Sequence, residues 1–338
     1  MSTLLSILVP DKNFLNMYNA NQPFDLYLTS FDFFALSNIE QLKAIENLYT
    51  KEKVHFIYDS FSNIKNFLES EITKEFINRV KENKIKLVIT QNEYCGIKDE
   101  DLEYIKNNLW FFSAPNVLYY QASYKKTDYN FGQNLYVGVI IHHLLKDLLV
   151  KNDYNHFEQK HTKVFLTLNN KRRPSRIHLF DLYNSIQDKN KILASFNFKN
   201  IFLEENLFHK DNYSHVSLYK QNVIEFYKKC LFEIVSETHG DAATEKTYKP
   251  LICGVPFVLY NKNPLDTIYY YKSLDIDINY FNIDYTDLKN VDDFIKNQLN
   301  NDIDILKEKY KDVFEKAKEN KIKIFNYFNN VYNKIKEL

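Results

Sequence analysis

The sequence predicts an α/β protein with two domains, each built on a parallel sheet that helices cover. Three observations predict this class. Short apolar runs of strand length alternate with helix-length amphipathic patterns through most of the 338 residues. A polar stretch at residues 151–162 interrupts the alternation and is expected to be the linker. Hydrophobic residues make up 45% of the chain, which is enough to fill two cores.

The first half begins the alternation. Strands are expected at residues 4–9, 24–28, 54–58, 85–90 and 117–121, and helices at residues 39–48, 70–82 and 135–150. Parallel neighbours need a long crossover connection, so a helix between successive strands favours a parallel sheet. The start, MSTLLSILVPDKN, has no basic stretch and only a short apolar run. It is therefore expected to be a first strand and not a signal peptide.

The second half resumes the alternation after the polar stretch. Strands are expected at residues 164–168, 191–196, 231–235 and 255–260, and helices at residues 174–186, 215–229, 244–253 and 287–299. Residues 274–281 are expected to form either a further strand or an irregular connection. The predicted domains are residues 1–155 and 156–300, followed by a C-terminal helix over residues 301–338.

The C-terminal segment has a helical period. Apolar side chains recur three, four or seven residues apart, at Ile303, Leu306, Tyr310, Val313, Ala317, Ile324, Phe328, Val331 and Ile335. This spacing predicts a long helix with one apolar face, broken near Asn320. The helix is expected to pack on the protein's own core. A membrane or partner helix is the alternative, and acidic residues within its positive face disfavour it.

Composition excludes several classes of protein. The net charge is +0 and the pI about 7.1, so no overall basic field favours nucleic acid or an anionic membrane. Five glycines are too few for a glycine-rich phosphate loop, and three isolated cysteines give no zinc spacing. No apolar run approaches the ~18 residues of a membrane span. A cytoplasmic protein is expected, and the Asn, Lys, Ile, Tyr and Phe bias suggests a phage, viral or low-GC bacterial origin.

The stretch LFEIVSETHGDAATEKTYKPLICGVPFVLY, residues 231–260, reads as strand, loop, short helix and strand. Such a unit places its polar residues at the carboxyl end of a strand, where open α/β sheets bind ligands. Thr244 is a candidate helix cap, and Lys246 adds positive charge to the anion site that a helix start provides. The carboxylates of Glu237 and Glu245 suit sugar hydroxyls. The alternative is an ordinary capped helix with a Glu245–Lys249 surface pair.

These residues resemble the donor-binding segment of the alpha-1,3-fucosyltransferases. They are also similar to related bacterial and phage-encoded glycosyltransferases with a TEK-x-x-KP-x-x-x-G-x-PF pattern. The resemblance covers roughly thirty residues, and a match to a motif of this length is a hypothesis about function. It implies that Glu245 contacts the donor ribose and Lys246 the diphosphate, with Tyr248 also in the donor site. Pro250 departs from the fucosyltransferase form and is expected to bend or shorten the helix, which leaves the transferred sugar open.

A second basic motif follows the strand at residues 164–168. Arg172, Arg173 and Arg176 surround Pro174, which fits the first turn of a helix. Arginine forks match phosphate oxygens, and like charges at a helix start favour a bound anion. A solvated basic turn is the alternative. The phage-type relatives carry a similar stretch, and the resemblance implies that Arg173 or Arg176 holds the donor diphosphate.

Together the two motifs predict the two-Rossmann-like-domain architecture called GT-B. The second half would bind a GDP- or UDP-linked sugar and the first half the acceptor. Positive side chains at the diphosphate can replace a metal, so neither a metal nor another cofactor is expected. The competing metal-dependent type uses a DxD motif, which Asp275-Ile276-Asp277 and Asp302-Ile303-Asp304 match in form.

An inverting transfer also needs a general base for the acceptor hydroxyl. Candidates follow predicted strands of the first half: Glu93, then Asp32 and Asp59. His239, in the donor loop, is a candidate phosphate contact or an idle surface residue.

The predicted function is sugar transfer from a nucleotide-diphosphate sugar to a hydroxyl acceptor, a glycan or another. One alternative is a phage-type DNA glycosyltransferase acting on hydroxymethylated bases. The other is a non-catalytic nucleotide- or carbohydrate-binding protein with the same fold.

Overall fold

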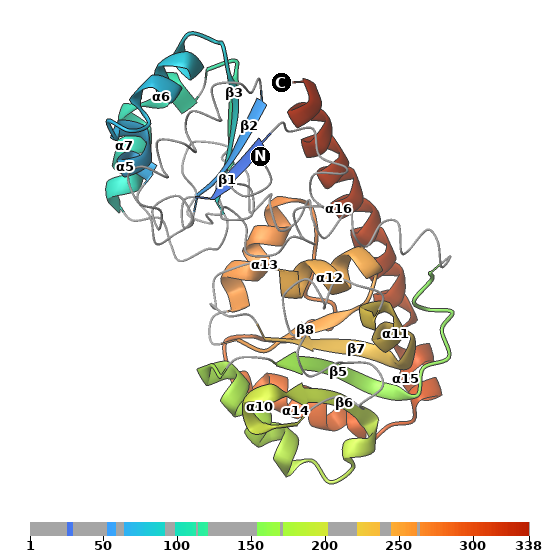
Figure 1. Ribbon diagram of the computed structural model, residues 1–338. Coiled ribbons are helices and arrows are strands. Elements are labelled where there is room, and N and C mark those ends of the chain that lie inside the picture. Colours follow the sequence, from blue (N-terminus) through green and yellow to red (C-terminus); the bar gives the residue numbers. More distant parts are fainter. Residues whose placement is uncertain are drawn as a thin grey trace. The chain divides into compact units, whose positions relative to one another are not determined.

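The computed structural model describes residues 26–29, 53–58, 64–91, 99–112, 114–120, 154–169, 172–201, 222–236, 245–261 and 264–337. The chain divides into two compact units, Met1–Ile140 with Asn329–Leu338 and Ile141–Phe328. Each unit contains a four-stranded parallel sheet together with helices (Figure 1). The predicted α/β class with parallel sheets is therefore confirmed. The predicted domain boundaries stay a prediction.

The sheet of the first unit has the strand order β1-β2-β3-β4. Its strands are β1 (Leu26–Thr29), β2 (Lys53–Tyr58), β3 (Lys86–Gln91) and β4 (Val117–Tyr120). All three strand pairs are parallel, with Val54 opposite Leu87 and Leu87 opposite Val117. The four carboxyl ends therefore lie at one edge of this sheet.

The helices of the first unit are α5 (Ile64–Glu69), α6 (Lys74–Lys81), α7 (Asp99–Asn107) and α8 (Leu109–Phe112). Phe76, Ile77 and Val80 form the buried face of α6, at the spacing of one helix stripe. The predicted helix at residues 70–82 is therefore shorter, because a turn at residues 71–73 separates α6 from α5. The predicted strand at residues 4–9 and the helices at residues 39–48 and 135–150 lie outside the described residues.

The sheet of the second unit has the order β6-β5-β7-β8, and every pair is parallel (Figure 1). Its strands are β5 (Lys163–Asn169), β6 (Ile192–Phe196), β7 (Cys230–Val235) and β8 (Phe257–Leu259). All residues of β7 are buried. Continuous burial is typical of a central parallel strand with both faces covered, and it explains the unbroken apolar run in the sequence.

The helices of this unit include α10 (Pro174–Ser185), α11 (Asn222–Lys229), α12 (Glu245–Cys253), α13 (Pro264–Ser273) and α14 (Leu288–Leu299). Short 3₁₀ turns flank β6 at Lys189–Lys191 and Asn197–Lys199. Residues 274–287 contain turns and irregular segments. The irregular connection, one of the two predictions for residues 274–281, is therefore confirmed.

The sequence predicts that Pro250 bends or shortens helix α12. This helix runs through Pro250 to Cys253, so the expected shortening is wrong, and the expected bend stays a prediction. The helix stops at Gly254, which has the left-handed φ of 69°. There the Val255 N–H donates to the Pro250 carbonyl at 2.8 Å and the Gly254 N–H to the Leu251 carbonyl at 3.2 Å. This pair of bonds is a Schellman cap. Proline costs the helix one backbone bond, while its carbonyl helps to end the helix three residues later.

The C-terminal segment forms α15 (Ile303–Lys309) and α16 (Lys311–Glu337). The break falls at Tyr310, and the predicted break near Asn320 is wrong. Asn320 is 3% exposed, and its side chain donates to the Asp277 carbonyl and the Tyr280 hydroxyl. Because this amide bonds to another segment, it does not compete for the backbone of its own helix.

Apolar residues of these helices are buried in the second unit. Leu306, Phe314, Ala317, Ile324 and Phe328 are each at most 3% exposed. Phe314 packs on Phe232 of β7 with ring centroids 5.8 Å apart. No helix in the described part of the chain has the length and apolar character needed to cross a membrane.

The described part of the predicted linker, residues 154–162, packs into the second unit. Tyr154, His156 and His161 are between 3% and 8% exposed. His156 Nε2 lies 2.9 Å from the Leu231 carbonyl, and its Nδ1 lies 2.7 Å from the Tyr154 hydroxyl. This segment is thus part of the core at the amino edge of the second sheet, where β5 begins.

Candidate functional site

The strand order of the second sheet creates a switch point between β5 and β7. From β5 the chain moves to β6 on one side, and it later returns to β7 on the other. Right-handed crossovers then place α10 and α12 on opposite faces of the sheet. Open α/β sheets bind ligands at the carboxyl ends of the strands that flank such a point. The candidate site therefore lies at the ends of β5 and β7.

Backbone pairing between β5 and β7 extends to Leu166 and Glu233 and not beyond. Past that pair, the Thr167 hydroxyl donates to the Ile234 carbonyl at 3.1 Å. Asn169 Nδ2 in turn donates to the Thr167 hydroxyl oxygen at 3.0 Å. Side chains thus replace the backbone ladder at the end of these strands.

Asn169, the last residue of β5, is 1% exposed. Its Oδ1 is buried and has no hydrogen-bond partner in the described part of the chain. A buried carbonyl oxygen without a donor costs about 1–3 kcal/mol. Such a group at a switch point favours a ligand that donates a hydrogen bond, such as a hydroxyl.

Helix α10 starts directly after this strand, with Arg173 as its extended N-cap and Pro174 in the first turn. No side chain caps this helix start. Arg173 is partly exposed, but its Nε is buried and lacks a hydrogen-bond partner among the described residues. An uncapped helix start and a guanidinium N–H together favour a bound anion.

Arg176 has a different environment from Arg173. It is 3% exposed, and its Nη2 donates to the Ser236 carbonyl at 3.2 Å. The hydroxyls of Ser175 and Ser236 lie 3.0 Å apart. These contacts connect the start of α10 to the residue that follows β7. Arg172 is exposed and Arg176 is buried, so Arg173 is the partly exposed member of the three arginines.

Helix α12 contributes the TEK motif from the β7 side. It leads back into the amino end of β8, so its first turn lies toward the carboxyl edge. Lys246, in that turn, is partly exposed. Tyr248, predicted in the donor site, is 1% exposed and packs on Tyr271 and Phe328, with its hydroxyl 2.7 Å from that of Tyr270. Tyr248 therefore packs in the core and stabilises α12 there.

Several predicted site residues lie outside the described residues. These are Glu237, Thr244 and His239 in the donor loop, and Asp32, Asp59 and Glu93 in the first half. Glu245 begins α12, and its side chain is not described. Their roles stay predictions.

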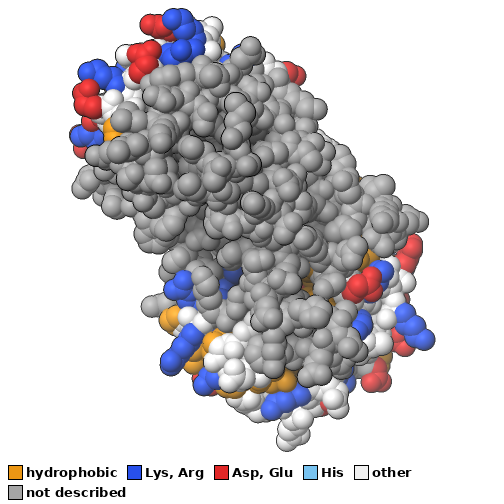
Figure 2. Space-filling view, viewed as in Figure 1, with side chains coloured by type: hydrophobic (Ala, Val, Ile, Leu, Met, Phe, Trp, Pro, Cys, Tyr) orange, Lys and Arg blue, Asp and Glu red, His pale blue; other side chains and the backbone are white. Residues whose placement is uncertain are grey.

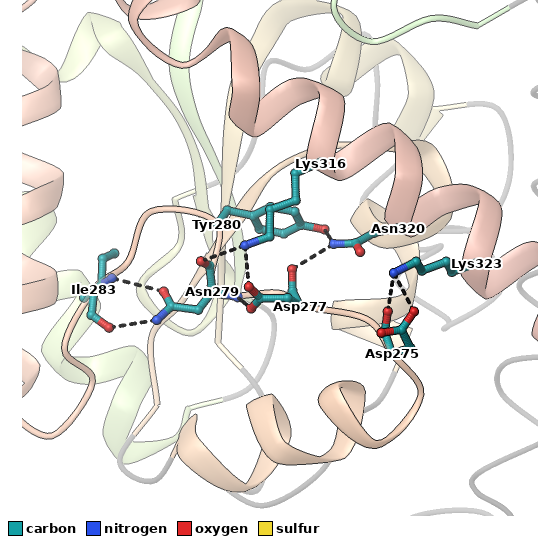
Figure 3. A network of polar contacts seen from close by, with 8 residues as sticks. All are labelled: Asp275, Asp277, Asn279, Tyr280, Ile283, Lys316, Asn320 and Lys323. Atoms are coloured by element: carbon teal, nitrogen blue, oxygen red, sulfur yellow. Dashed lines mark hydrogen bonds and ion pairs between the residues drawn. The ribbon is translucent and has the colours of Figure 1, made fainter.

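The Asp275 and Asp277 carboxylates, which fit the DxD pattern, are paired with lysines of α16 (Figure 3). Lys323 Nζ lies 2.8 Å from Asp275 Oδ2, and Lys316 Nζ lies 2.5 Å from Asp277 Oδ2. Asp302 is the N-cap of α15. The described residues contain no group of three or more His, Cys, Asp or Glu side chains placed to hold a metal ion.

The sequence did not single out Asn169, Ser175 and Ser236. Each is one polar residue at the end of a strand or the start of a helix. The available signal was position, because Asn169 and Ser236 are the first polar residues after the apolar stretches of β5 and β7. The hydrogen bond from Arg176 to Ser236 joins residues 60 apart in the chain, which no local pattern shows.

Comparison with protein-family models, with curated proteins and with solved structures finds no match to this chain.

Proposed function

We propose that the chain is a glycosyltransferase that transfers a sugar from a GDP- or UDP-linked donor to a hydroxyl acceptor. The donor diphosphate binds at the start of α10, beside the switch point between β5 and β7. The observation that carries this proposal is that two buried polar groups at one edge of the sheet both lack a hydrogen-bond partner among the described residues. Arg173 Nε needs an acceptor and Asn169 Oδ1 needs a donor. A nucleotide sugar supplies phosphate oxygens for the first and hydroxyls for the second.

The chemistry follows from the charges at this edge. The acceptor hydroxyl oxygen attacks the anomeric carbon, and the bond from that carbon to the diphosphate oxygen breaks. Negative charge develops on the departing diphosphate. Arg173 and Lys246, with the start of α10, stabilise that charge. Arg176 acts through Ser236, because its contact to that carbonyl holds α10 against the end of β7.

The proton of the acceptor hydroxyl passes to a carboxylate of the first unit, in an inverting transfer. Glu93, Asp32 and Asp59 follow, within three residues in the sequence, the carboxyl ends of β3, β1 and β2. These strands are neighbours in one parallel sheet. Glu93 is the first candidate for the base, and Asp32 and Asp59 are the others.

The transfer is metal-independent in this proposal. The DxD-like carboxylates Asp275 and Asp277 already have lysine partners on α16 (Figure 3). A divalent cation there would displace both lysines. The cationic side chains at the carboxyl edge provide the positive charge that a metal supplies in the other type of enzyme.

A glycan or similar hydroxyl compound is the proposed acceptor. On the face in Figure 2, acidic and basic side chains alternate over the helices of the first unit. The surface lysines Lys65, Lys74 and Lys84 each pair with a glutamate. Binding of duplex DNA relies on many unpaired cations along one surface, so this distribution favours a neutral acceptor over the DNA alternative.

The test is the affinity of the full chain for GDP, UDP and CDP and for their sugars, measured by thermal shift and calorimetry. One of these nucleotides should raise the melting temperature. Arg173→Gln should lower the affinity for that nucleotide at least about tenfold, since charge-assisted hydrogen bonds to phosphate contribute roughly 1.5–3 kcal/mol. Arg172→Gln is the matched control, and its affinity should stay within about twofold.

Two results would contradict the proposal. One is that no nucleotide or nucleotide sugar binds. The other is that Arg173→Gln binds as tightly as the wild type. If the donor sugar binds but is neither transferred nor hydrolysed with any hydroxyl acceptor, the non-catalytic alternative replaces the enzyme.

A further inference from the structure

A cavity of about 290 Å³ opens at the amino edge of the second sheet, the edge opposite to the anion site. Three segments line it: residues 154–158 before β5, the turn between α12 and β8 at Cys253 and Gly254, and one face of α16. Each lining segment precedes a strand of the sheet or packs beside one. The cavity is therefore separate from the proposed donor site.

Lys321 distinguishes this cavity from the surrounding surface. Four lysines lie on α16 between Phe314 and Ile324. Three have carboxylate partners, because Lys316 pairs with Asp277, Lys318 with Glu315 and Lys323 with Asp275. For Lys321, the described residues provide no carboxylate within 4.0 Å. Burial lowers the pKa of its ammonium group, as expected for a cation with little water and no counter-charge.

The position of Lys321 is held by the turn that ends α12. A Cβ at Gly254 would lie 3.4 Å from Lys321 Cδ and 3.8 Å from its Cβ. The hydrocarbon part of the lysine thus packs on the glycine backbone, and the ammonium extends along the cavity lining. Long cationic side chains commonly bury the stem in this way.

Aromatic rings form the apolar part of the lining. The ring centroid of Phe314 lies 5.3 Å from that of Phe157 and 5.7 Å from that of His156. Burial lowers the pKa of His156 to about 4, so this imidazole is neutral near pH 7. The inner cation of the cavity is therefore Lys321.

Two exposed carboxylates, Glu158 and Glu315, also line the cavity. They oppose a ligand with two or more negative charges, such as a phosphate or a nucleotide. Small-molecule sites combine apolar walls with a few placed polar groups, and this volume lies just below their range of about 300–1,000 Å³. A small ligand with one negative charge and an apolar body fits these features.

We propose that this cavity binds a small organic monocarboxylate, whose carboxylate pairs with Lys321 and whose apolar body packs on Phe157 and Phe314. The proposal is independent of the glycosyltransferase activity. It assigns to the amino edge a ligand site with its own chemistry, on the same sheet that binds the donor at the opposite edge.

The test uses phenylacetate as the probe, with hexanoate as an aliphatic second probe and 2-phenylethanol as the neutral analogue. Binding to the full chain is measured by calorimetry and by ligand-observed NMR. Phenylacetate or hexanoate should bind, and Lys321→Met should weaken the binding at least about tenfold. Lys323→Met removes a lysine of the same helix that does not line the cavity and should keep the affinity within about twofold. Phenylethanol should bind more weakly than phenylacetate.

Lys321→Met removes a partly buried charge and keeps the apolar stem, so the variant should fold, and its melting temperature in the absence of ligand checks this. Arg173→Gln should bind the probes as the wild type does, which separates this site from the donor site. Equal binding by the wild type and Lys321→Met would overturn the proposal. Absence of binding by both carboxylates would overturn it as well.

Discussion

The two edges of the second sheet differ in the polar groups they bury and in what surrounds those groups. At the carboxyl edge, Asn169 Oδ1 and Arg173 Nε are buried without partners among the described residues. At the amino edge, both ring nitrogens of His156 have partners, Leu231 and Tyr154, whereas those of His161 are buried without partners among the described residues. A buried group without a partner costs stability that a ligand can return, and the His156 contacts stabilise the fold. The unpaired groups at the carboxyl edge lie beside the switch point, and those at the amino edge lie in a cluster of packed rings.

The rings at the amino edge join three segments of the second unit. Phe314 of α16 contacts Phe232 of β7, Phe157 and His156, with centroid distances between 5.3 and 5.8 Å. It therefore joins the C-terminal helix to the central strand and to the segment before β5. At the carboxyl edge, Phe196 at the end of β6 packs on Phe180 and Tyr183 of α10, so the rings there join that helix to an outer strand.

The largest expected effect tests this difference directly. Phe314→Ala should lower the free energy of unfolding by about 3–5 kcal/mol, because it leaves a cavity among the rings. Arg173→Ala at the opposite edge should change it by less than about 1 kcal/mol without ligand, since its buried Nε has no partner to lose. Urea unfolding of both variants measures the two values. Similar losses in the two variants would contradict this difference between the packed ring at one edge and the unpaired arginine at the other.

Much of this fold could be predicted from the sequence, because its signals are local. The buried parallel strands appear as apolar runs, and β7 is continuous in both sequence and structure. The arginine cluster was also visible, since charges around a proline at a helix start form a short motif. Pro250 shows the limit of such local rules. The bonds at Gly254 complete the helix end, so proline does not shorten α12.

The amino edge could not be predicted in the same way. Residues 151–162 are polar in composition, and the sequence indicated a linker there. The burial of His156 depends on Leu231, 75 residues away, and on Phe314 still further along the chain. Asn169 and Ser236 at the carboxyl edge are equally indistinct in sequence. In each case, the order of the strands in the sheet determines which residues become neighbours, and no single sequence motif encodes that order.

The second prediction concerns pH and again separates the two edges. Burial lowers the pKa of His156 to about 4 and that of His161 to about 3, from an ordinary value of 6.5. The His156 imidazole, with its ring centroid 4.7 Å from that of His161, also lowers the pKa of His161, and Lys307 adds to both shifts. Both rings are therefore neutral in the folded protein near pH 7.

The sign follows from the unfolded chain. As the pH falls below 6.5, both imidazoles become protonated in the unfolded chain, whereas in the folded protein they stay neutral down to about pH 4. Stability is thus fully present above pH 6.5 and is lost below it, by up to about 1.4 kcal/mol per pH unit for each histidine. His161→Phe should reduce this slope, measured by urea unfolding between pH 7 and pH 5. His178→Gln, a change at an exposed histidine, should leave the slope unchanged. Parallel curves for the wild type and His161→Phe would show that buried imidazoles do not cause the acid sensitivity.

The smallest expected effect concerns the contribution of a surface ion pair to the stability of α16. Lys316 pairs with Asp277, and the two side chains are 29% and 58% exposed. Asp277→Asn removes this ion pair but keeps Oδ1 as an acceptor for the Asn279 N–H. Exposed pairs contribute about 0.2–1 kcal/mol, so the variant should lose no more than that, and the loss should shrink in high salt. A double-mutant cycle with Lys316→Met isolates the coupling between the two residues. A coupling comparable to the loss in Phe314→Ala would mean that ion pairs, and not buried rings, hold this helix on the sheet.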